Sequence, residues 1–104
     1  MFNVVVKRLD GSYESQKVKT KEDIRGIIGA NIGDSEPIVL TENLILFYNF
    51  DKIKEIGHMT GRIVDKDGYP NFVCGDLVIC KVDGSQLDSV TDDDFETIKT
   101  LLVS

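Results

Sequence analysis

The side chains best suited to covalent chemistry are one histidine and two cysteines. His58 lies in the glycine-flanked segment Gly57-His58-Met59-Thr60-Gly61, where it could act as a base toward the thiol of Cys74 or Cys80. No local pattern pairs them, and a loop histidine without a catalytic role is the simpler interpretation. Five residues separate the cysteines, whereas a redox pair is usually separated by two. We therefore expect reduced, buried cysteines and a protein that is not an enzyme.

Two other patterns resemble ligand sites but fail in detail. Asp65-Lys66-Asp67-Gly68 looks like the start of a calcium loop, yet its glycine comes two positions early and a third oxygen ligand is missing. Glycines 26, 29 and 33 lack the lysine and the strand-loop-helix setting of a phosphate-binding loop. We predict neither a metal nor a cofactor.

Acidic side chains gather near the C-terminal end, and they have two interpretations. The cluster consists of Asp88, Asp92, Asp93, Asp94 and Glu96. Carboxylates in the first turn of a helix stabilise it by about 0.3–1 kcal/mol each, so capping and solubility explain much of the cluster. The carboxylates that capping does not need could imitate a phosphate backbone and occupy the basic surface of another protein, such as a nucleic-acid enzyme. Capping together with solubility is the favoured explanation of the cluster; as a binding surface, this acidic patch is the predicted partner-binding site.

A second candidate site would bind a small molecule of the nucleotide type. Aromatic rings and cations could converge on such a ligand, and the available candidates are Tyr48, His58, Arg62 and Tyr69.

The order of predicted elements defines the fold class. The chain has 104 residues, which suits one domain covering residues 1–104. Strands are expected over 2–8, 13–18, 37–40, 44–48, 62–64, 71–74 and 77–82, with 13–18 at an edge and 44–48 in a central position. Residues 49–59 fit a helical turn or a strand. Helices are predicted at about 21–30 and 92–102, each with a threonine cap and a regularly spaced apolar stripe. Because helices do not alternate with strands, we predict an α+β fold with a largely antiparallel sheet of five to seven strands.

Three Asp-Gly pairs mark the turns, at residues 10–11, 67–68 and 83–84. Asp-Gly favours a type I′ hairpin turn, in which both central residues have positive φ.

Charge and hydropathy exclude several classes of partner. The formal net charge is -6, and residues 83–104 carry six acidic residues against one lysine. Such a surface disfavours direct binding to nucleic acid or to an anionic membrane. No apolar run approaches the roughly 20 residues needed to span a bilayer, and residues 1–8 do not resemble a signal peptide. We expect a cytoplasmic protein.

Two blocks of sequence resemble a known family. The first combines Glu22-Asp23-Ile24, Gly29 and Ile32 with Pro37-Ile38-Val39-Leu40, Leu44-Ile45-Leu46 and Asn49; the second runs from Gly75-Asp76-Leu77-Val78-Ile79-Cys80 to Asp88-Ser89-Val90-Thr91-Asp92-Asp93-Asp94. They are similar to a small domain-of-unknown-function family of phage, plasmid and Firmicute mobile-element proteins. The resemblance covers about residues 20–100. This sequence departs from the family at residues 57–62, where an Asn-Arg pair is expected and only Arg62 is present. It implies a small accessory protein without catalysis.

These observations favour a non-enzymatic, acidic accessory protein of a phage or mobile element. Such a protein would bind and modulate a host protein with a basic surface, for example a host-defence or nucleic-acid enzyme. The contact could be the acidic patch or the exposed edge of residues 13–18. A small-molecule binding protein is the alternative, and the oligomeric state stays open.

Overall fold

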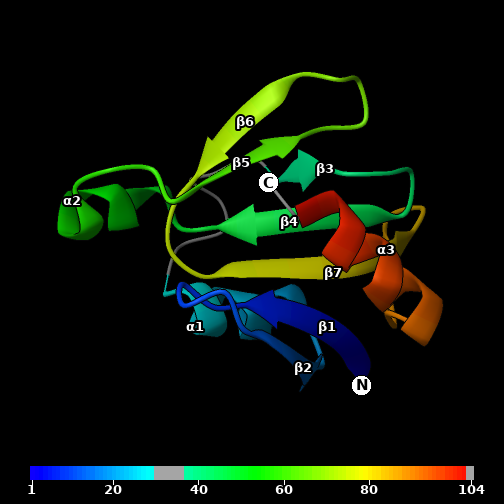
Figure 1. The fold of residues 1–104 in the computed structure, drawn as a ribbon. Coiled ribbons are helices and arrows are strands. Elements are labelled where there is room, and N and C mark those ends of the chain that lie inside the picture. The colour runs from blue at the N-terminus through cyan, green and yellow to red at the C-terminus, as the bar shows by residue number, and fades with distance from the viewer. Residues whose placement is uncertain (30–36, 103–104) are drawn as a thin grey trace.

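Two antiparallel sheets and three α-helices make up the computed structural model, which describes residues 1–29 and 37–102 (Figure 1). The larger sheet follows the order β2-β1-β7-β4-β3, with the short β8 also paired to β7, and the smaller sheet is the hairpin β5–β6. The elements are β1 (Phe2–Lys7), β2 (Tyr13–Val18), α1 (Lys21–Ile28), β3 (Ile38–Val39), β4 (Leu44–Tyr48), the 3-10 turn η2 (Phe50–Lys52), α2 (Ile53–Ile56), β5 (Gly61–Val64), β6 (Pro70–Val73), β7 (Leu77–Asp83), β8 (Gln86–Asp88) and α3 (Asp92–Leu102). The predicted α+β class is confirmed.

The larger sheet is covered on both faces, which explains its uninterrupted apolar strands. Val4 and Val6 of β1 point toward α1 and pack with its Ile24 and Ile28. Val5, between them, points to the opposite face. There it joins a core whose other members come from β3 to β7, the segment before α3, and α3 itself, including Ile63, Val73, Ile79, Ile98 and Leu102. The predictions of a central 44–48 strand and an edge 13–18 strand are both confirmed.

Both main helices begin as predicted, and the first ends early. Thr20 precedes α1 in an extended conformation, and the Asp23 carboxylate accepts the Thr20 amide at 3.3 Å. Gly29 then takes a left-handed conformation with φ 69°, so α1 ends at Ile28; residue 30, the predicted end, lies outside the described residues. The last helix covers residues 92–102, as the sequence predicts.

The three Asp-Gly turns form, but the type I′ prediction is wrong. Among the described residues only glycines have positive φ, whereas a type I′ turn needs it at both central residues. In the first turn Arg8 N–H donates to Ser12 O at 2.8 Å and Gly11 N–H donates to Arg8 O at 2.9 Å. This is a type I turn followed by a glycine bulge, and the β5–β6 turn repeats it.

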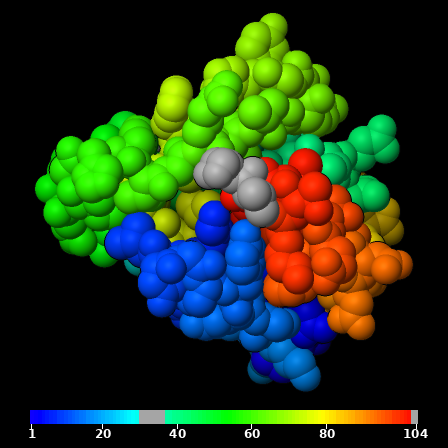
Figure 2. Space-filling model, viewed as in Figure 1, coloured from blue at the N-terminus to red at the C-terminus, as the bar shows by residue number. Residues whose placement is uncertain are grey.

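The β5–β6 hairpin stands apart from the larger sheet yet shares its core. Figure 2 shows it as a green lobe above the blue surface of β1 and β2 and the red surface of α3. Its Ile63 and Val73 are 3% and 1% exposed because they pack into the main core. One backbone bond, from Lys66 N–H to Val39 O at 2.9 Å, ties the end of the hairpin to the outer strand β3. Within the ambiguous stretch 49–59, residues 50–56 form η2 and α2.

Candidate functional site

The outer side of the β5–β6 hairpin carries the most conspicuous exposed apolar group. The register pairs Arg62 with Phe72 and Val64 with Pro70, so these four side chains share the side turned away from the core. We call them the hairpin face. Val64 is 46% exposed and Phe72 is 54% exposed. Tyr69, beside the turn, is 69% exposed at the tip of the hairpin.

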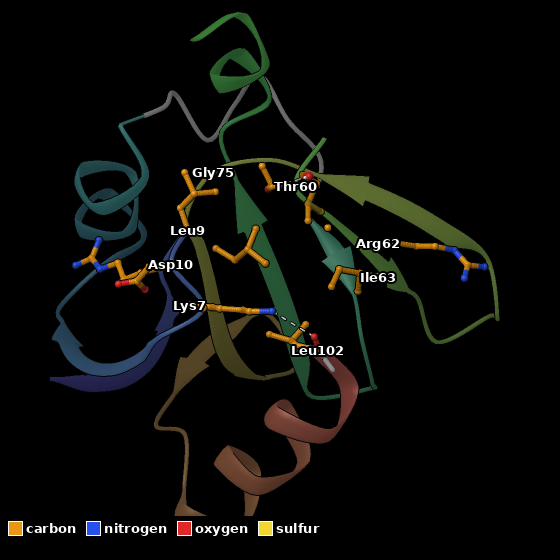
Figure 3. Close-up of a pocket in the computed structure, with 13 residues that line it drawn as sticks. Lys7, Leu9, Asp10, Thr60, Arg62, Ile63, Gly75 and Leu102 are labelled. Carbon is orange, nitrogen blue, oxygen red and sulfur yellow. Dashed lines mark hydrogen bonds between the residues drawn. The ribbon is translucent and has the colours of Figure 1, made fainter. Parts of the chain in front are cut away.

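Arg62 gives this face a positive charge. Its guanidinium points away from the body of the protein (Figure 3). Within residues 1–29 and 37–102, no ion pair is formed by Arg62. A solvent-facing arginine beside aromatic and aliphatic side chains is the composition that contact centres of protein interfaces favour.

The acidic cluster separates into carboxylates used inside the fold and carboxylates left at the surface. Asp94 accepts the Thr91 amide at 3.0 Å and the Lys81 ammonium at 2.9 Å. Burial alone would raise the pKa of Asp94, but the bonds from Thr91 and Lys81 outweigh it and the pKa is lowered. Asp94 therefore serves as the carboxylate of a capping box at the start of α3.

The other acidic residues remain exposed. Asp88 accepts the amide of Ser89 at 2.8 Å, and Glu96 pairs with Lys99 at 3.1 Å on the surface of α3. Asp92 and Asp93 are exposed in the first turn of α3. Capping thus accounts for Asp94, while four of the five predicted residues could still face a partner.

A cavity of about 250 Å³ lies among the β1–β2 turn, the hairpin and the end of α3 (Figure 3). Its walls are mixed, with Leu9, Ile63 and Leu102 among the apolar residues and Asp10 and Thr60 among the polar ones. Lys7 enters from β1, and its ammonium donates to the Leu102 carbonyl at 3.3 Å. Arg8 is also in the wall but is held by Glu14 and Asp76, at 3.0 Å and 3.1 Å. Lys7 and Arg8 are already bonded, and the guanidinium of Arg62 points away from the cavity, so the wall offers little for an anionic ligand.

The four residues predicted to bind a small molecule do not share one of these cavities. Tyr48 lines a different cavity of about 310 Å³, together with Asp65 and Asn71, and burial raises the pKa of its hydroxyl. Arg62 lies at the edge of the 250 Å³ cavity, while His58 and Tyr69 are exposed and line neither.

Both cysteines are free and buried, as predicted. The Cys74 thiol donates to the Asn49 carbonyl at 3.4 Å, and burial raises its pKa. Burial raises the pKa of Cys80 to about 12, far above that of a reactive thiol.

The described residues contain neither a metal-binding cluster nor a membrane-spanning helix. No group of three or more histidine, cysteine, aspartate or glutamate side chains there is placed to hold a metal ion. No described helix is long and apolar enough to span a membrane.

No family model, curated protein or solved structure matches this chain. The resemblance to a mobile-element family therefore stays a prediction.

Proposed function

We propose that this chain is a small accessory protein, of the kind carried by phages and mobile elements, that acts by binding and modulating a host protein. The observation that carries the proposal is the hairpin face. When another surface covers apolar side chains that are exposed together on one side of a hairpin, their removal from water lowers the free energy. Phe72 provides a large contact area, and Arg62 can pair with an acid.

The chemistry of this face defines the partner that it fits. The complementary surface is apolar at its centre and places a carboxylate against Arg62, since burying the guanidinium without a counter-charge would be costly. The hairpin is anchored through the buried Ile63 and Val73, so its outer face is held in place before binding. A preordered face loses little conformational entropy in the complex.

A paired set of variants tests the proposal. Val64→Ser with Phe72→Ser removes the apolar centre, while Leu101→Ser removes a 36% exposed leucine from α3 as a control. Affinity purification from host lysate should yield one protein with the wild type and with Leu101→Ser, and lose it with the double variant. Titration calorimetry with that purified protein should then show weakening of about tenfold or more for Arg62→Glu. Equal binding by all variants would refute the proposal.

A basic partner at the acidic cluster is the second candidate. It is favoured by the finding that capping uses Asp94 and leaves Asp92 and Asp93 exposed. The variant Asp92→Asn with Asp93→Asn retains the cap and removes two charges. Binding that falls steeply with added salt and is lost in this variant would identify the acidic cluster as the contact.

A small-molecule function has less geometric support, because Tyr48, His58, Arg62 and Tyr69 are dispersed. Thermal-shift measurements with nucleotides test it directly. A nucleotide present at 100 times its dissociation constant should stabilise the protein by about 2.7 kcal/mol.

A further inference from the structure

The outer edge of the larger sheet at β2 has unpaired backbone groups. The bond from Arg8 N–H to Ser12 O shows that these two residues form a hydrogen-bonded pair. Antiparallel pairs alternate, so Val6–Glu14 and Val4–Gln16 are also hydrogen-bonded pairs. The amides and carbonyls of Tyr13, Ser15 and Lys17 therefore point outward. Within the described chain, β1 is the only strand paired with β2.

Two other strands at the margins of the fold, β3 and β6, are protected, and β2 is not. Lys66 bonds to the outer carbonyl of Val39 in β3. In β6 the missing N–H of Pro70 lies on the outer edge, because Asp65–Tyr69 is the hydrogen-bonded pair next to it. Strand β2 has six residues, no proline and no covering segment among the described residues (Figure 1). Such an edge is suited to pairing with another strand.

We propose that β2 pairs antiparallel with β2 of a second copy, centred on Ser15, to join the two sheets. In this register Ser15 lies opposite its counterpart, Tyr13 opposite Lys17, and Glu14 opposite Gln16. Each outward residue both donates and accepts, giving about six backbone hydrogen bonds between the copies. The ring of Tyr13 then lies beside the ammonium of Lys17, and the carboxylate of Glu14 lies beside the amide of Gln16. The two Ser15 hydroxyls face each other.

Charge disfavours two alternative registers and favours a second copy as the occupant. Centring on Glu14 would place two carboxylates opposite each other, and centring on Lys17 would do the same with two ammonium groups. The strand carries one acid and one lysine and is neutral, although the whole chain has a net charge of -6. Most of the surface repels another copy, whereas this edge does not.

The surface next to this edge also has room for a neighbouring strand. An open hollow of about 450 Å³ is lined by Gln16, Lys17 and Val18 of β2 and by Met1 and Ile27. Met1 is 72% exposed there. The wall is mixed, since Lys19 and Asp23 also line it, and a second β2 would cover part of it as well as the backbone groups.

Sedimentation velocity over a concentration series tests the inference, with a matched pair of variants at one position. Because the interface is small, we expect a reversible dimer with a dissociation constant on the order of 100 µM. Ser15→Pro removes an outward N–H without removing a bond to β1, and should weaken the dimer by about tenfold or more. Ser15→Thr keeps that N–H and should dimerise like the wild type. Thermal melts of both variants check that the fold is retained.

Hydrogen exchange supplies a second readout that does not depend on any variant. Raising the wild-type concentration should slow exchange at the amides of Tyr13, Ser15 and Lys17 and leave those of β7 unchanged. A wild type that stays monomeric near 1 mM, or a Ser15→Pro variant that dimerises normally, would overturn the inference. Loss of the dimer leaves the proposed partner binding untested, since the hairpin face is separate from β2.

Discussion

Replacing Asn49 should destabilise the protein more than any single surface change, because Asn49 joins three segments. It is 8% exposed, and its Nδ2 donates to the carbonyls of Ile28 and Gly29 at 3.4 Å and 3.2 Å. Its Oδ1 accepts the Asp51 amide at 3.0 Å and caps η2. The side chain therefore binds the end of α1 to the segment that follows β4.

The expected cost follows from these three bonds. Loss of a cap costs about 1 kcal/mol. Leaving two α1 carbonyls short of a donor costs about another 1–2 kcal/mol, with the 3.4 Å bond contributing least. Asn49→Ala should therefore lower the free energy of unfolding by about 2–3 kcal/mol. For a domain of this size, the melting temperature should fall by roughly 10–20 °C.

Chemical denaturation of matched variants provides the assay. Asn43→Ala is the control, because the Asn43 side chain is exposed, and it should change stability by less than about 0.5 kcal/mol. Asn49→Asp keeps the oxygen that caps η2 but places a mostly buried carboxylate against the α1 carbonyls, so it should destabilise the protein at least as much as Asn49→Ala. A loss below about 0.5 kcal/mol for Asn49→Ala would refute the reasoning.

Three further predictions concern backbone, thiols and pH. Gly26→Ala should stabilise the protein by about 0.5–1 kcal/mol, because an added Cβ meets open space at this position of α1. Gly29→Ala should destabilise it by about 1 kcal/mol or more, because Gly29 has a φ of 69°. Urea titration of both variants compares their free energies of unfolding. Both cysteines should resist a thiol reagent at about pH 8 in the native state and react fully in denaturant, since burial raises the pKa of each thiol; rapid native labelling would contradict this. The pKa of Asp94 is lowered by folding, so its stabilising effect is present above its unfolded pKa and lost as pH falls through its folded pKa. Asp94→Asn should therefore show a weaker loss of stability between about pH 5 and pH 2 than the wild type, by thermal melts at each pH.

The elements were predictable where one local signal dominates. Val4-Val5-Val6 indicates a strand from β-branching alone, and Thr91 followed by three aspartates indicates a helix start. Strand β8 was missed, because Gln86–Asp88 has three residues and little apolar pattern. It forms because Gly84, with φ 63°, allows a two-residue turn that returns the chain to β7. The early end of α1 depends in the same way on Gly29, which the sequence shows only as one of several glycines.

The candidate surfaces depended on tertiary arrangement and were only partly predictable. Arg62 and Tyr69 were selected from the sequence as ligand-binding residues, but for a pocket that they do not form. Val64 and Phe72 were not selected, because each is adjacent to another apolar residue, Ile63 or Val73, whose side chain lies on the opposite side of the hairpin. Only packing shows which side the core covers. Capping by the first-turn carboxylates was predicted, but the ion pair of Asp94 with Lys81 was not, because Lys81 is distant in the sequence.

The two proposed surfaces lie at opposite margins of the larger sheet, and this placement has a consequence for binding. β2 forms one edge, while the hairpin is tied to β3 at the other. A dimer joined through β2 would therefore carry one hairpin face at each far end, leaving both available to partners. Two linked sites raise the apparent affinity for a partner that is itself dimeric or immobilised densely, without any new contact. Ser15→Pro should then weaken binding to a dense surface of partner while leaving one-to-one binding in solution unchanged. Equal loss in both formats would mean that the substitution damages the hairpin, and equal retention in both would mean that the two copies do not act together.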